Sequence, residues 1–142
     1  MVAIMQRIDL RAIVIAFFAE LAIDMLVVQV LLMIFGHDIF TSGMSAEEVQ
    51  KAIDTIVAKG SYVFASFVTG MSTTVLGGYL AARLAKGFPY YNGLGIGVVG
   101  VVFVLSFATD GPLWFTILGV LLTIPASIYG AHLATKRARV AE

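Results

Sequence analysis

Four long apolar stretches constrain this chain more than any other feature of its sequence. They cover residues 12–35, 62–84, 90–107 and 113–133. A helix needs about 20 residues to cross a hydrocarbon core about 30 Å thick, and the third stretch only just reaches that length. Because the core holds no water to satisfy open backbone groups, each span has to be helical. The sequence therefore predicts an all-α membrane protein, a four-helix transmembrane bundle that forms one domain over residues 1–142 and contacts the lipid bilayer.

Composition agrees with this class and excludes several others. The chain is 60% hydrophobic and 13% charged, whereas soluble domains are about 25% charged. Its net charge is zero, so no basic excess points to a nucleic-acid partner. The absence of cysteine excludes thiol catalysis and cysteine-based metal sites. The two histidines, His37 and His132, are far apart in sequence, and we expect neither a metal site nor a cofactor.

The basic residues indicate how the spans are oriented. Seven of the nine Lys and Arg residues lie in the N-terminal segment, the second connection and the C-terminal segment. The first connection carries only Lys51 and Lys59, and the third carries Asp110 without any base. Because Lys and Arg accumulate in cytoplasmic flanks, we expect both termini in the cytoplasm. The expected location is a bacterial or archaeal cell membrane.

The first connection is long and has helical features of its own. Ser45 is followed three residues later by Glu48, the spacing of a capping box. Apolar residues then recur at helical spacing from Val49 to Val57, and Gly60 follows the run. The pattern predicts a short amphipathic outer helix. Its apolar face either lies in the headgroup region or caps the bundle.

Small residues recur along the last three spans at intervals that place them on one face of each helix. Helices in lipid associate through close packing and polar contacts, because lipid tails are as apolar as the helices themselves. We therefore predict helix packing at these glycines, with a glycine-lined pore or groove as the alternative; the opposite side of the second span, which includes Phe67, is assigned to lipid. The predicted packing positions are Gly70, Gly77, Gly93, Gly97, Gly119 and Gly130.

Two acidic residues inside the first span, Glu20 and Asp24, are the best functional candidates. They lie one turn apart on the same helix face, about 12 and 18 Å from the start of the span at residue 12. A charge at that depth costs at least about 2.5 kcal/mol, and the two carboxylates also repel, so we expect at least one to be protonated. The pair is suited to carrying protons or binding a cation. Alternatively, the acids hydrogen-bond Thr73, Ser72 or Thr123, or pair with a partner chain.

One segment resembles a known group of proteins. Residues 77–83 read Gly-Gly-Tyr-Leu-Ala-Ala-Arg, and after a short turn Asn92 precedes Gly93 and Gly97. This pattern resembles small uncharacterised four-span bacterial membrane proteins, and it covers residues 77–97 of the 142. The resemblance implies the four-span topology and adds no chemistry.

Two functions remain open. The chain has no phosphate-binding loop, nucleophile elbow or zinc-protease motif, and we expect no enzymatic activity. The leading hypothesis is a transporter or channel for protons, cations or a small solute that uses Glu20 and Asp24, with Thr73 and Thr123 as further binding candidates. The alternative is a non-catalytic accessory or assembly subunit. Because four short spans enclose little space, we expect a homo-oligomer or a larger membrane complex.

Overall fold

The computed structural model describes residues 8–107 and 112–140, and within them the chain is a bundle of α-helices. Four helices are long and apolar enough to cross a membrane, which confirms the predicted four-helix bundle; the protein is an integral membrane protein. The predicted outer helix is also present. The helices are α2 (Leu10–Gly36), α3 (Ala46–Val57), α4 (Gly60–Leu84), α5 (Pro89–Phe107) and α6 (Leu113–Val140).

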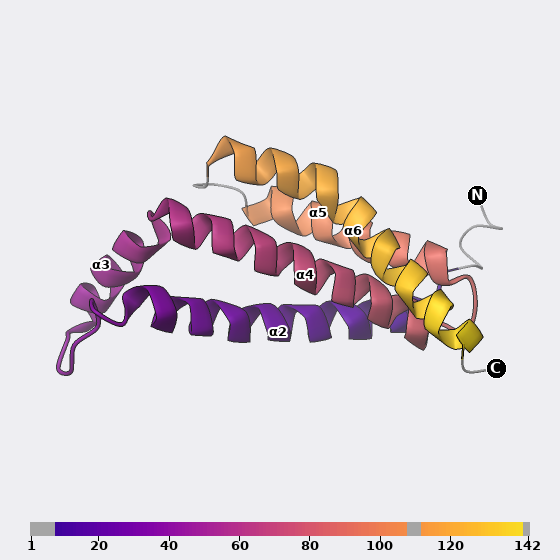
Figure 1. Cartoon of the computed structure of the whole chain (residues 1–142), viewed down its shortest axis with the longest axis horizontal. Helices are drawn as coiled ribbons and strands as arrows, with labels where there is room; N and C mark the ends of the chain where they lie inside the picture. Colours follow the sequence, from indigo (N-terminus) through magenta and orange to yellow (C-terminus); the bar gives the residue numbers. More distant parts are fainter. Residues whose placement is uncertain (1–7, 108–111, 141–142) are drawn as a thin grey trace.

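Helix α4 is the centre of the bundle. It contacts α2, α3, α5 and α6, whereas α2 and α6 do not contact each other along the described residues. Figure 1 shows that α2 and α4 lie alongside each other, that α5 and α6 form a second pair, and that the start of α2 and the end of α6 lie at one end of the molecule. Helix α6 changes direction along its length (Figure 1), as expected of a helix that contains Pro125.

The two ends of the bundle differ in charge. The end at which α2 and α5 begin, here the basic end, carries Arg11, Arg83, Lys86, Lys136 and Arg137 among the described residues. The opposite end, here the acidic end, carries α3 and the acids Asp38, Glu47, Glu48 and Asp54. Asp110 of the third connection lies outside the described residues. The charge asymmetry predicted from the sequence thus separates two physical ends of one bundle.

The capping box at the start of α3 is formed as predicted. The Ser45 backbone N–H donates to Glu48 Oε2 at 2.7 Å, and the Glu48 backbone N–H donates to Ser45 Oγ at 3.4 Å. On the apolar face of α3, Ile56 is fully buried and packs with Leu31 of α2 and Tyr62 of α4. Of the two positions open for this helix, the structure shows the one that caps the bundle.

Small residues allow the helices to touch at the basic end. A Cβ at Gly78 would overlap the Ser127 carbonyl of α6, and a Cβ at Gly130 would overlap the Val75 carbonyl of α4. Gly93 brings α5 to the same region, because its Cβ would lie 2.6 Å from Ala131 Cβ. A larger side chain at these positions would push the backbones apart.

Two predicted packing positions depart from this pattern. A Cβ at Gly70 would meet no atom within 4 Å, and one at Gly119 would meet only Val104 Cγ1, at an ordinary 3.8 Å. The assignment of Phe67 to lipid is also wrong, since its ring lies 5.6 Å from the Trp114 ring and 5.5 Å from the Phe115 ring. These residues lie in the half of the bundle where α4 and α6 are further apart, so contact between them requires large side chains.

Candidate functional site

A cavity of about 190 Å³ lies between α2, α4, α5 and α6. Both predicted acids line it, together with side chains from each of the three other helices. A volume of this size holds several water molecules or one small solute, provided that polar groups are available to bind them. The polar lining consists of Glu20, Asp24, Ser66, Thr74 and Thr123, with Gly70 beside them.

The Glu20 side chain lies against Gly77 on α4. A Cβ at position 77 would overlap the Glu20 carboxyl group. Gly77 was predicted to provide helix packing, and the atom it makes room for is a carboxylate oxygen rather than a neighbouring backbone. The Thr74 hydroxyl, one turn earlier on α4, lines the cavity and donates to the Gly70 carbonyl at 3.0 Å. Gly77 therefore provides the room that the Glu20 carboxyl group occupies beside α4.

Asp24 is tied to α4 through Thr73. Thr73 Oγ1 lies 2.6 Å from Asp24 Oδ1 and 2.8 Å from the Gly70 carbonyl oxygen. A hydroxyl has a single proton and two lone pairs, so it donates to one of these oxygens at a time. When Asp24 is ionised, Thr73 donates to it; when Asp24 is protonated, Asp24 donates to Thr73, and Thr73 donates to Gly70. The same geometry accommodates both protonation states of the acid.

Thr123 and Ser72 do not take the roles considered for them. Thr123 lines the cavity, but its hydroxyl donates to the Gly119 carbonyl of its own helix at 2.6 Å. Ser72 is exposed on the other side of α4 and donates to the Val68 carbonyl at 2.8 Å. Of the hydroxyls expected to bind the acids, Thr73 is the one that the structure pairs with a carboxylate.

Ser66 adds a polar group that nothing in the described chain satisfies. Its hydroxyl oxygen is buried, lines the cavity and has no hydrogen-bond partner among the described residues. Buried polar groups in proteins nearly always have a partner, frequently an ordered water. The cavity therefore has at least one polar position suited to water or to a bound solute.

The cavity contains oxygen atoms but no base. Among the described residues that line it there is no Lys, Arg or His. Nor do those residues form a group of three or more His, Cys, Asp or Glu that could hold a metal ion. The remaining wall is largely aromatic, from Phe17, Phe67, Phe103 and Phe115. Carboxylate, hydroxyl and carbonyl oxygens in an apolar enclosure can exchange protons or bind a weakly hydrated cation.

The cavity occupies one half of the bundle. From Glu20 it extends toward the acidic end as far as Phe115, two residues after α6 begins. Toward the basic end the helices close on each other: Ile13, Ala16 and Ile96 belong to one buried cluster, and Gly78 meets the Ser127 backbone. The carboxylates thus stand at the inner limit of a cavity that reaches toward a single end of the protein.

No protein-family model, curated protein or solved structure matches this chain. The resemblance at residues 77–97 stays a prediction.

Proposed function

We propose that this protein is a small membrane transporter or channel that moves protons or a monovalent cation through its central cavity. The observation that carries the proposal is the position of Glu20 and Asp24, two carboxylates without an internal base, at the inner limit of a half-length cavity. Buried acids in membrane helices are costly and typically serve ion or proton pathways. In this proposal the acidic end faces outward and the basic end faces the cytoplasm.

The cavity provides a route for the transported ion from the acidic end to the two carboxylates. A proton entering from the acidic end first meets the hydroxyl-lined part of the cavity and then reaches the carboxylates. Thr73 can accept a hydrogen bond from protonated Asp24 or donate one to ionised Asp24, which keeps both states satisfied. Release toward the basic end requires the packed small-residue half to open, because the cavity does not extend through it.

Self-association or assembly with another chain is favoured by a separate observation. Gln29, in the second half of α2, is exposed, and so are the nearby residues Met25 and Met33. A polar amide facing lipid lacks hydrogen-bond partners, and such residues commonly join helices across an interface. We propose that this face of α2 contacts a second chain. If that chain is a different protein, the accessory-subunit function is favoured over the transport function.

Flux measurements on reconstituted protein test the proposal. Purified protein in liposomes is given a pH, Na⁺ or K⁺ gradient, and flux is followed with an internal dye. Wild type should exceed empty liposomes for at least one ion, and the double variant E20Q/D24N should abolish that flux while remaining folded. E47Q, which removes an exposed acid on α3, is the matched control and should keep full flux. Wild-type flux no greater than that of empty liposomes would reject the transport function and favour the accessory role.

A further inference from the structure

A long groove follows the contact between α4 and α6 on the outside of the bundle. It consists of two hollows, of about 650 and 480 Å³, which share Ser72 and Val75. Its origin is the close crossing of the two helices, where Gly130 meets the Val75 carbonyl. Because the helices cross at this point, they separate beyond it and leave a channel along their outer side.

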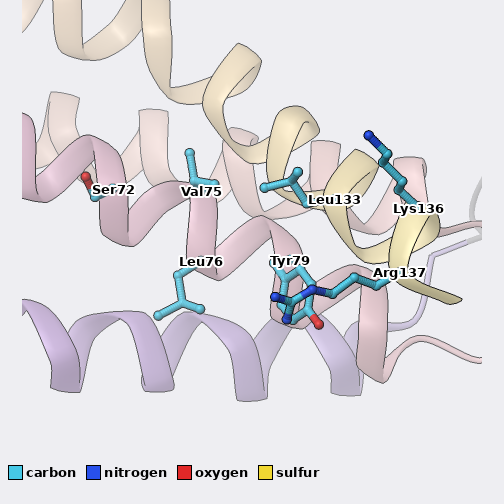
Figure 2. A pocket seen from close by; sticks show the side chains of 7 residues that line it. All are labelled: Ser72, Val75, Leu76, Tyr79, Leu133, Lys136 and Arg137. Carbon is cyan, nitrogen blue, oxygen red and sulfur yellow. The ribbon is translucent and has the colours of Figure 1, made fainter. Parts of the chain in front are cut away.

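The hollow nearer the basic end combines apolar walls with a cationic rim. Figure 2 shows Val75, Leu76 and Tyr79 on α4 and Leu133 on α6, with Lys136 and Arg137 on the last turns of α6. Both cations are exposed. Ion pairs among the described residues join His37 to Asp38 and Glu47 to Lys51, all at the acidic end. Lys136 and Arg137 are therefore available to an anion from outside the described chain.

The second hollow continues the groove toward the middle of the bundle. Its walls are almost entirely apolar, and the hydroxyl of Ser72 is satisfied by the Val68 carbonyl. Pro125 and Ala126 line it on α6 and leave room beside α4. From Lys136 at the rim to Ala126 in the second hollow, ten residues along α6, the groove covers about 15 Å at about 1.5 Å per residue. That length is close to half of a hydrocarbon core about 30 Å thick, which is the depth of one leaflet.

We infer that this groove binds one anionic phospholipid from the leaflet at the basic end. Its phosphate would lie at Lys136 and Arg137, and one acyl chain would follow the apolar hollows toward Pro125 and Ala126. The positive charge of the rim matches the phosphate of such a lipid. The apolar walls and the one-leaflet length of the groove match its acyl chain. A free phosphate would use only the rim. The inference is independent of the proposed transport function.

Lipid binding can be measured on the purified protein by native mass spectrometry and by thermal stability. The probes are phosphatidylglycerol and phosphatidylcholine with identical acyl chains, added in detergent, with inorganic phosphate as a third probe. Wild type should retain one phosphatidylglycerol and bind phosphatidylcholine at least tenfold more weakly. K136Q/R137Q should weaken phosphatidylglycerol binding roughly 25-fold, because each basic residue near an anionic lipid contributes about fivefold. R11Q/R83Q removes the same charge from the basic end outside the groove and should change binding less than threefold.

A second variant tests the acyl channel without touching the rim. A126W fills the second hollow of the groove from a half-buried position and should reduce phosphatidylglycerol binding at least tenfold while the helix content is unchanged. Equal losses in K136Q/R137Q and R11Q/R83Q would overturn the site in favour of general charge attraction. Full binding by A126W would overturn the acyl channel, and equal stabilisation by inorganic phosphate would show that no lipid is required. A disulfide cross-link between two copies of the A126C variant would assign the groove to an oligomer instead.

Discussion

The two halves of α4 perform different tasks. Toward the basic end, Gly77, Gly78, Ala81 and Ala82 are all buried, and the small-residue face of the helix packs closely against its neighbours. Toward the acidic end, Ser66 and Gly70 are half-buried and line a cavity. Both halves are rich in small residues, and the sequence pattern alone does not separate them. What separates them is whether a neighbouring backbone lies within reach of the small residue.

This difference shows how packing is divided in a lipid-embedded bundle. Without a hydrophobic gain from association, close contact between helices depends on van der Waals packing and interhelical hydrogen bonds. The half near the basic end uses packing, as where Gly78 meets Ser127. The other half uses the polar contact between Thr73 and Asp24 and aromatic contacts such as that between Phe67 and Phe115. We expect the first half to hold the fold together and the second to adapt to a bound ion.

The largest predicted effect is a difference in stability between two variants, each of which adds one methyl group to one half of α4. In G78A the new methyl overlaps the Ser127 carbonyl, a backbone atom that cannot rotate away. Overpacking of this kind costs about 1–3 kcal/mol, and occasionally more. In G70A the methyl meets open space, and alanine favours a helix by about 0.5–1 kcal/mol over glycine. Thermal unfolding in detergent should therefore place G78A well below wild type and G70A at or above it.

These two variants are mutual controls, because each replaces a helical glycine of α4 by alanine. If G70A destabilised the protein as much as G78A, the proposed division of α4 into a packed half and an open half would be wrong.

A smaller and more specific effect is expected at Gly77. In G77A the methyl overlaps the Glu20 carboxyl group, which is the end of a side chain and can move. The displaced acid loses its position in the cavity, so flux should fall at least tenfold while stability falls by about 1–2 kcal/mol at most. The double variant E20A/G77A should regain the lost stability and still lack flux. A double-mutant cycle gives the coupling energy between the two positions, and additive effects would contradict their contact.

Thr73 gives a third test, confined to the open half. T73V removes the hydroxyl that pairs with Asp24, and a lost hydrogen bond to a charged group costs about 1.5–3 kcal/mol. We expect roughly tenfold or greater loss of flux, since about 1.4 kcal/mol corresponds to a factor of ten. T73S keeps the hydroxyl and should retain most of the flux. If T73V and T73S behaved alike, the hydroxyl of Thr73 would have no role in the transported ion's path.

The sequence predicted the spans, the capped outer helix and the charge asymmetry, because each depends on local pattern. It gave Thr73 only as one of three hydroxyls that could pair with the acids, and the structure selects Thr73 for Asp24. It did not locate Thr74 and Gly78, although both follow Gly70 at intervals of four residues. It also assigned Phe67 to lipid, because Phe67 lies opposite the small-residue face of the second span. The distance between two crossing helices varies with position, and residue spacing within one helix carries no information about it.

The smallest predicted effect concerns the end of the packed half, where Asp9 caps α2. The backbone N–H of Ala12 hydrogen-bonds the Asp9 carboxylate, and this contact, with further ones from Lys86 and Arg11, holds its pKa below the ordinary value of 3.8. The Asp9 backbone N–H also donates to Oδ1 of the fully buried Asn92 at 2.7 Å. A group whose pKa is lowered on folding stabilises the protein above its unfolded pKa, and that contribution is lost as pH falls through the folded pKa.

The D9N variant keeps a capping side chain but no charge, so its melting temperature should change less than that of wild type between pH 5 and pH 3. Identical pH profiles for the two proteins would mean that the charge on Asp9 adds nothing to the cap.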